Sequence, residues 1–248
     1  MSSETKRWGT RPFWGLSFDY DPQWFLTEEQ KEIQKRLIDL CRTTLRPNAL
    51  VSDQRYEFPY KNMKALASQG LLGLIIPKEY GGLGQNHVCM AMVVETIARY
   101  GCPSTAMVCV MHYIAVSALL LRHHSNARVQ DLLLRVNKDA LIGTVSYSDP
   151  ATGGHFWYPM SSRTQMTADG RIKLLKCGSW ATSAGFADFY VIITTSPQFD
   201  GNFSNMSCFL LFKVCSKCRD VFMTDAIGRV KETHRWRGLI ATMSNVRL

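Results

Sequence analysis

The hydrophobic pattern of this chain changes its period near Ala140, and this change limits the folds that the chain can adopt. Before Ala140, apolar residues recur three or four positions apart, which is the period of an amphipathic helix. After it, short runs rich in β-branched and aromatic residues alternate with turn formers, which is the pattern of strands. We therefore predict an α+β protein, with an N-terminal all-α helical bundle followed by a small antiparallel β-barrel or β-sandwich.

The length of 248 residues is sufficient for two domains, each with its own core. We expect the helical domain over residues 26–140 and the β domain over residues 141–248. Residues 1–25 are rich in glycine, proline and aromatic residues but show no regular period, so we interpret them as an N-terminal arm.

The helical part opens with a start signal. Thr27-Glu-Glu-Gln30 has the form of a capping box, in which two backbone N–H groups at the helix start are satisfied by side chains. We expect Pro47 to end this first helix, because proline lacks the N–H that a helix interior requires. Gly70 is expected to close a second helix over residues 60–69. Further helices are predicted over residues 88–100, 104–121 and 126–138.

Residues 104–121 form the most apolar run of the chain. Their length is close to the roughly 18–20 residues that a membrane span requires. His112 falls in the middle of the run, however, and both flanks have the composition of helix ends. We therefore predict a central buried helix of a soluble bundle and no membrane span.

The strand-like part contains a hairpin signal. Asp169-Gly170 separates two short strand patterns over residues 162–167 and 171–176, as in a tight β-turn. Other strand-like runs are predicted over residues 141–146, 188–196 and 207–214.

The net charge of +9 has no block of basic residues behind it, so we expect an anionic cofactor or substrate and no nucleic acid. Cys215-Ser-Lys-Cys218 has no second cysteine pair at zinc spacing, and we predict no metal site there. Scattered cysteines without a secretory signal indicate reduced thiols and an intracellular protein, either mitochondrial or cytoplasmic. The eight cysteines are Cys41, Cys89, Cys102, Cys109, Cys177, Cys208, Cys215 and Cys218.

The junction between the two parts, residues 143–160, is rich in turn formers and hydroxyls. Asp149-Pro150 favours a turn, and Gly153-Gly154 allows backbone to approach a ligand closely. Ser148 adds a hydroxyl that can donate or accept a hydrogen bond. An ordinary solvated loop explains the same residues.

A second candidate is Trp180-Ala-Thr182, after the predicted hairpin. Here an indole ring can lie against a flat heteroaromatic group while the neighbouring hydroxyl bonds to the edge of that group. A core tryptophan at a strand end is the alternative.

Together these stretches resemble the acyl-CoA dehydrogenase family. The family's P-x-E-Y-G-G-x-G turn appears as Pro77-Lys-Glu-Tyr-Gly-Gly-Leu-Gly84, and its T-E-P-x-x-G-S stretch as Ser148-Asp-Pro-Ala-Thr-Gly-Gly154. Its W-[IV]-[TS]-[NS] segment appears as Trp180-Ala-Thr-Ser183, followed by the usual Ala187-Asp188. The resemblance runs in order from about Thr27 to Leu248.

The resemblance implies an FAD bound over the β domain and an acyl-CoA thioester as substrate, oxidised at its α,β bond with hydride transfer to flavin N5. Gly154 and His155 would lie on the substrate side, and both depart from the family pattern of serine and aspartate. Ser148 in place of threonine keeps the hydroxyl. The cofactor-binding positions implied are Val145, Ser146, Tyr147, Ser148, Asp149, Pro150, Gly153, Gly154, Trp180, Ala181 and Thr182.

The end of the sequence, from Trp236, resembles a region late in the family's β domain. Family members continue into a helical domain that supplies the catalytic base, so the resemblance implies a truncated form and leaves the base and the electron acceptor unassigned. We expect a homo-oligomer or a complex with a longer family subunit. Two alternatives stay open: a non-catalytic interaction protein of this family, and flavin-dependent oxidation of a substrate without CoA.

Overall fold

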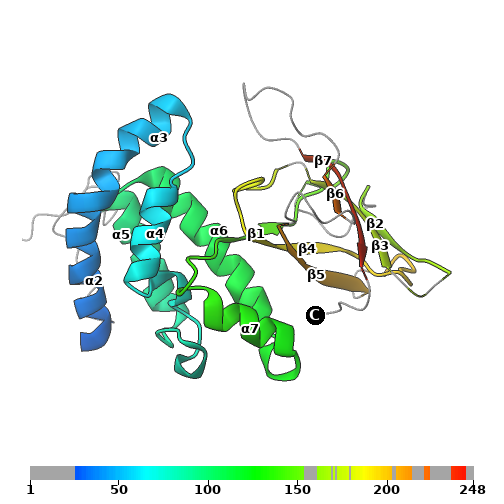
Figure 1. Ribbon diagram of the computed structural model, residues 1–248, viewed down its shortest axis with the longest axis horizontal. Helices are drawn as coiled ribbons and strands as arrows, with labels where there is room; N and C mark the ends of the chain where they lie inside the picture. Colours follow the sequence, from blue (N-terminus) through cyan, green and yellow to red (C-terminus); the bar gives the residue numbers. More distant parts are fainter. Residues whose placement is uncertain are drawn as a thin grey trace, which may run out of the picture.

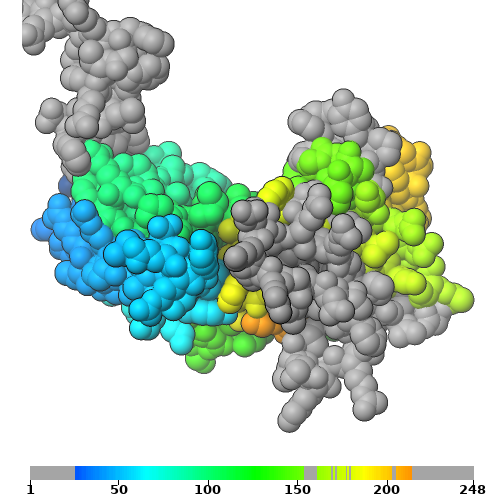
Figure 2. Space-filling view, turned by 90° about the horizontal axis from the view of Figure 1, so that it is seen from above, coloured from blue at the N-terminus to red at the C-terminus, as the bar shows by residue number. Residues whose placement is uncertain are grey.

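The computed structural model describes residues 26–153, 161–168, 170, 172–178, 180–202, 205–213, 221–223 and 236–243. The helices gather at one end of the molecule and the strands at the other (Figure 1). In the space-filling view they form two adjoining lobes (Figure 2). The predicted arm, the Cys215–Cys218 pair, Gly154 and His155 lie outside the described residues.

Helix α2 (Glu28–Leu40) starts as predicted. The backbone N–H of Gln30 donates to Thr27 Oγ1 at 3.3 Å, and the N–H of Thr27 donates to Gln30 Oε1 at 3.2 Å, which completes the capping box. The prediction that Pro47 ends this helix is wrong. The α-helix ends at Leu40, but the backbone stays helical through a π turn (Cys41–Leu45) and a 3₁₀ turn (Arg46–Asn48).

Pro47 falls in the first turn of that 3₁₀ segment, where its missing N–H breaks no bond. The chain then continues directly into α3 (Ala49–Arg55). The other predicted helices are present within a few residues of their expected ends. They are α4 (Tyr60–Ser68), α5 (His87–Tyr100), α6 (Pro103–Leu120) and α7 (Ala127–Arg135).

The loop between α4 and α5 depends on its glycines. Gly81 and Gly84 have φ angles of +77° and +64°, which side chains rarely tolerate. Gly82 is needed for a different reason, because a Cβ there would collide with the carbonyl oxygen of Ile76. These glycines therefore make residues 77–84 an ordered turn between α4 and α5.

Helix α6 occupies the centre of the helical part and contacts α5 and the first strand. Within the described residues, α6 is the one helix long and apolar enough to cross a membrane, and half of its apolar window is buried. The buried positions include His112 and Tyr113, both fully enclosed, as expected for a core helix. Tyr113 donates its hydroxyl to the carbonyl of Leu71 at 2.7 Å.

The strands form two sheets. The first has the order β1 (Gly143–Ser146), β4 (Phe189–Thr195) and β5 (Met206–Phe212). The second has the order β2 (Arg163–Met166), β3 (Ile172–Gly178), β7 (Trp236–Met243) and β6 (Val221–Met223). The predicted hairpin joins β2 to β3 and turns at Gly170, whose φ is +77°.

Every pair among the described strands is antiparallel, as predicted, except β1 with β4. This pair is parallel because the chain leaves β1, forms the β2–β3 hairpin in the other sheet, and returns as β4. The described strands form two separate sheets, so the sandwich alternative fits and a closed barrel does not.

The first sheet is the middle layer of the molecule. One face contributes Val145, Val191 and Leu210 to the same core as the helices. The other face contributes Ile192 and Phe209 to a second core that includes residues of β3. Burial on both faces explains why β4 is apolar along nearly its whole length.

Candidate functional site

The end of β1 leads into a tight turn held by a buried carboxylate. The Asp149 side chain is fully buried and accepts hydrogen bonds from the backbone N–H groups of Ala151 (3.0 Å), Ser161 (2.9 Å) and Ser162 (2.8 Å). The Ser162 hydroxyl also donates to it, at 2.6 Å. Burial acts to raise the pKa of Asp149, but these hydrogen bonds outweigh it and the pKa lies below its usual value.

Asp149 was predicted to contact a cofactor, and the structure places its carboxylate inside the protein instead. The backbone N–H and carbonyl of Asp149 both pair with Gly153, at 2.9 and 2.7 Å, which closes the turn. The carboxylate therefore shapes the loop rather than lining a pocket.

The structure brings the two predicted stretches together. The Ser148 hydroxyl donates to the carbonyl of Trp180 at 3.1 Å and accepts from the N–H of Trp180 at 3.3 Å. Four residues earlier, on β1, the Thr144 hydroxyl donates to the carbonyl of Thr182 at 2.5 Å. Hydroxyls on and just after β1 thus fix the segment that follows β3, although the stretches are about 30 positions apart in the sequence.

Trp180 is not a core tryptophan. Its side chain is 57% exposed, whereas the neighbouring Ala181 is buried. Two residues further on, Ser183 has a φ of +65° and a buried hydroxyl oxygen without a hydrogen-bond partner. A flat indole on the surface, beside a strained turn, has the form of a recognition element rather than of core packing.

The remaining predicted cofactor positions differ in how far their side chains are exposed. Val145 and Ser146 are buried, so their side chains face the interior. Tyr147 is half-buried, Pro150 is exposed, and the space around Gly153 is open. The surface of the candidate site therefore consists of the loop backbone from Tyr147 to Gly153 and the indole of Trp180.

A buried lysine supports this loop from behind. Lys176 on β3 is 3% exposed, and its Nζ donates to the carbonyls of Tyr147 at 3.0 Å and Ile193 at 3.3 Å. The sequence analysis did not predict a role for this lysine. Its position in the strand could have indicated one, because Ile172, Leu174 and Lys176 alternate along β3 and therefore share its inward face.

Two contacts fix the start of β1. His112 accepts the N–H of Gly143 on Nδ1 at 2.9 Å and donates from Nε2 to the carbonyl of Leu72, also at 2.9 Å. Burial lowers the pKa of His112 to about 4, so the ring is neutral at physiological pH. Asp188 accepts the N–H of Ile142 on its carboxylate at 2.8 Å.

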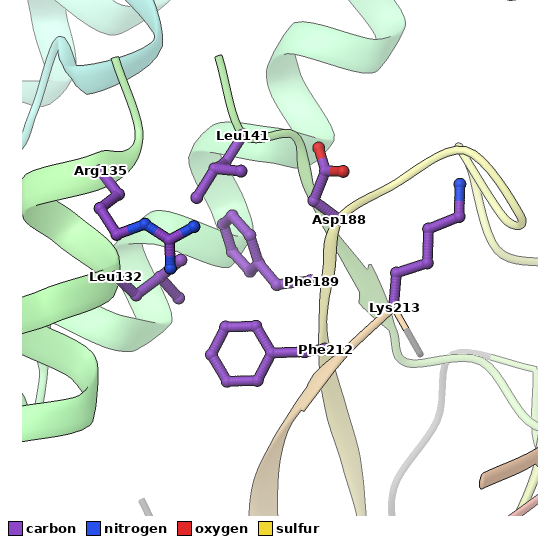
Figure 3. A pocket seen from close by; sticks show the side chains of 7 residues that line it. All are labelled: Leu132, Arg135, Leu141, Asp188, Phe189, Phe212 and Lys213. Atoms are coloured by element: carbon purple, nitrogen blue, oxygen red, sulfur yellow. The ribbon is translucent and has the colours of Figure 1, made fainter. Parts of the chain in front are cut away.

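A separate surface pocket of about 330 Å³ lies between α7 and the ends of β4 and β5 (Figure 3). The ring of Phe212 and the aliphatic side chain of Leu132 face this space. Arg135 at its rim is paired with Asp139 at 2.8 Å. The lining residues are Leu132, Arg135, Leu141, Asp188, Phe189, Phe212 and Lys213. None is a predicted cofactor position, so this pocket is distinct from the candidate site.

No group of three metal-ligating side chains is found in the part of the chain that the structure describes. Five of its cysteines are free thiols, at positions 41, 89, 102, 109 and 208. Burial raises the pKa of Cys109 to about 12 and that of Cys41 likewise, which makes these thiols unreactive.

Comparison with known proteins supports the resemblance seen in the motifs. Residues 27–138 match the family model described as "Acyl-CoA dehydrogenase, N-terminal domain". The chain is 27% identical over 191 residues to the probable acyl-CoA dehydrogenase fadE25 of Mycobacterium leprae, covering 76% of this chain and 47% of that protein. It is 24% identical over 189 residues to the short-chain specific acyl-CoA dehydrogenase of Clostridium acetobutylicum, covering 76% and 48%.

Solved structures share the fold. The chain is similar to a glutaryl-coenzyme A dehydrogenase bound to glutaryl-CoA, with a TM-score of 0.70 and 21% identity, covering 90% of this chain and 55% of that one. It is also similar to butyryl-CoA dehydrogenase from Megasphaera elsdenii, with a TM-score of 0.70 and 18% identity, covering 90% and 57%. The chain spans about half the length of the curated relatives that it matches.

Proposed function

We propose that this chain, which belongs to the acyl-CoA dehydrogenase family through residues 27–138, binds FAD on the loop after β1 and on Trp180. The observation that carries this proposal is the pair of hydrogen bonds between Ser148 and Trp180, which unites two motifs in one surface. The proposed reaction is the α,β-dehydrogenation of an acyl-CoA thioester.

The residues present fit a flavin. A flavin requires a flat partner for its ring system and hydrogen-bond donors at its edge. The exposed indole of Trp180 provides the first, and the hydroxyls of Ser148 and Thr182, both half-buried, provide candidates for the second. When bound, the flavin accepts a hydride from the substrate, and donors at its edge stabilise the charge that develops.

The Ser148 hydroxyl has a specific role in this proposal. It carries one proton, which is donated to the Trp180 carbonyl in the structure. To donate to a flavin, the hydroxyl must rotate away from this carbonyl while it keeps its bond from the Trp180 N–H. Ser148 therefore positions the indole and supplies an exchangeable donor at the same place.

The proton-abstracting base stays unassigned. Oxidation of an acyl thioester requires removal of the α-proton together with hydride loss, and a carboxylate is the usual base. Glu95, the acid among apolar residues on α5, pairs with Arg99 at 3.4 Å on the surface. It lies on a helix that carries none of the proposed flavin contacts, so we do not propose it as the base.

Flavin titration tests the proposal. Purified protein is mixed with FAD, and the visible spectrum and the retained flavin are measured after gel filtration. We expect a stoichiometric yellow complex and a flavin that is reduced by dithionite while bound. Failure to retain FAD at any protein concentration would contradict the proposal for this chain.

A second candidate function is a non-catalytic interaction subunit of the same family. Its support is an apolar stripe along α6 and its C-terminal cap, where Met107 is 55% exposed, Ile114 44% and the capping residue Leu121 81%. These residues are spaced seven apart, so they lie along one line of the helix. Exposed apolar area of this kind marks association surfaces.

Light scattering separates the two candidates. An interaction subunit forms a stable oligomer or co-purifies with a longer acyl-CoA dehydrogenase, and Ile114→Lys weakens this association. A monomer that turns over an acyl-CoA with an artificial electron acceptor would exclude the purely structural function. Wild-type protein and the exposed-site variant Lys35→Glu on α2 serve as controls.

A further inference from the structure

The segment that carries Trp180 ends in a contact with the helical part. Its last aromatic residue, Phe186, stacks on Phe58 from the loop between α3 and α4, with ring centroids 4.6 Å apart and ring planes at 7°. The hydroxyl of Tyr60, the first residue of α4, donates to the backbone carbonyl of Phe186 at 3.1 Å. The helical part therefore holds both the side chain and the backbone of Phe186.

Phe58, Tyr60 and Phe186 form one aromatic cluster. The Tyr60 ring stands edge-on to both other rings, with centroid distances of 4.7 Å to Phe58 and 6.0 Å to Phe186. Aromatic rings favour such edge-to-face pairs, which add stability beyond the area that they bury. Phe58 also packs against the core of the helical part, so the cluster is anchored on that side.

A tight turn joins this cluster to the proposed flavin segment. The carbonyl of Ser183 accepts the N–H of Phe186 at 3.0 Å and that of Ala187 at 2.9 Å. Ser183 and Gly185 have φ angles of +65° and +80°. A positive φ is unfavourable for serine, so the contacts around the turn must hold it in this shape. The turn is therefore a fixed connection between Thr182 and Phe186.

The segment is thus anchored at both ends. At its start, the hydroxyls of Ser148 and Thr144 bond to the backbone of Trp180 and Thr182. At its end, the aromatic cluster holds Phe186. A binding segment that is already fixed in its bound geometry has a smaller ordering cost when its ligand arrives. Loss of either anchor is therefore expected to weaken FAD binding.

We propose that Phe58 and Tyr60 are positioning residues for the flavin site. They fix Phe186, and through the turn at Ser183 they hold the indole of Trp180 in the orientation that binds FAD. This inference rests on the proposed function. It assigns part of the flavin affinity to the helical part, whereas the cofactor positions predicted from the sequence all lie in the β part.

A brace between the helical part and the β part that has no role in the site makes a different prediction. Its loss lowers the stability of the protein but leaves the FAD affinity of the folded protein unchanged. Tyr60→Phe removes the hydroxyl and keeps the ring, and Phe58→Leu removes the stacked ring and keeps an apolar side chain. Tyr56→Phe removes a hydroxyl from a nearby side chain that is 85% exposed, and it is the matched control.

The experiment measures the dissociation constant of FAD for each protein, at a temperature well below the midpoint of thermal unfolding. Hydrogen exchange of residues 180–187 is measured by mass spectrometry without FAD. We expect the dissociation constant to rise about fivefold in Tyr60→Phe, the effect of one lost hydrogen bond, and about tenfold in Phe58→Leu. The amides of Phe186 and Ala187 should exchange faster in both variants. Tyr56→Phe is expected to stay within about twofold of wild type in both measurements.

Wild-type FAD affinity or wild-type exchange in Tyr60→Phe would overturn the inference and leave the proposed function intact. This variant alters a single hydroxyl, so it decides the test even if Phe58→Leu does not fold. If the wild-type protein binds no FAD, the proposed function itself fails, and the first titration shows this before any variant is compared.

Discussion

The Nδ1 atom of His112 accepts the backbone N–H of Gly143 at 2.9 Å, and this bond joins the central helix to the first strand. Gly143 is itself required here, because a Cβ at this position would collide with the ring of Phe189. The opposite ring nitrogen of His112 bonds to Leu72 in the loop after α4. One imidazole therefore connects three segments in the arrangement that positions the candidate site.

Acidification is expected to destabilise the protein through His112. Its folded pKa of about 4 lies below the ordinary value of 6.5, so the unfolded chain binds more protons between these values. The contribution is complete above pH 6.5 and is lost as the pH falls toward 4, by about 3 kcal/mol in total. Urea unfolding at pH 7.5, 6 and 5 measures this loss.

Variant His112→Gln provides the comparison for this pH series. It is less stable than wild type at pH 7.5, since glutamine cannot reproduce both bonds at the imidazole spacing. Its stability should fall less steeply between pH 6.5 and 5. Equal slopes for the two proteins would assign the pH dependence to other groups.

Local signals in the sequence predicted the elements well. The capping box at Thr27, the hairpin turn at Gly170 and the glycine-rich turn before α5 are each decided within a few residues. The prediction that Pro47 ends the first helix failed because the backbone is no longer α-helical where the proline occurs. A π turn and a 3₁₀ turn already replace the α-helix there.

Contacts between distant segments could not be predicted in the same way. The parallel pairing of β1 with β4 depends on a hairpin inserted in another sheet. The inward register of Lys176 is visible in the sequence, but the carbonyls that receive its ammonium are not. The sequence shows that Asp149 follows β1, but not that the four donors around its carboxylate come partly from the far side of the turn.

Gly82→Ala is expected to destabilise the helical part by about 3 kcal/mol, the range of overpacked cores. The Ile76 carbonyl lies against Gly82 and is held there by the N–H of Gly84 at 2.9 Å, so the backbone cannot move away. Gly153→Ala is the matched control. Its site is open, and only the φ of +59° opposes a side chain, at about 1 kcal/mol.

Chemical denaturation ranks these two glycine variants. If the free energy of unfolding falls less in Gly82→Ala than in Gly153→Ala, the turn over residues 77–84 relaxes more easily than its hydrogen bonds indicate.

Asp149→Asn should weaken FAD binding without removing a direct contact. The amide supplies one oxygen in place of two, and its NH₂ group meets the N–H and hydroxyl donors of Ser161 and Ser162. The expected loss of stability is about 2 kcal/mol, as for buried hydrogen bonds to a charged group. The loop loosens, and FAD affinity falls with it.

Thermal unfolding and FAD titration are measured on the same Asp149→Asn sample. Full FAD affinity in a destabilised variant would show that the turn from Asp149 to Gly153 does not shape the flavin surface.

Trp180 and Ser148 separate ring stacking from loop positioning. Trp180→Ala removes a side chain that is 57% exposed, so stability should change by less than about 0.5 kcal/mol. FAD affinity is expected to fall roughly tenfold, because the stacking partner is lost. Trp180→Phe keeps a flat ring and should recover most of this affinity.

Ser148→Ala breaks both bonds to the Trp180 backbone and should weaken FAD binding by about 1 kcal/mol. Ser148→Thr retains the hydroxyl and is expected to bind as wild type does. If Trp180→Ala binds FAD normally while Ser148→Ala does not, then the loop backbone recognises FAD and the indole contributes little to the affinity.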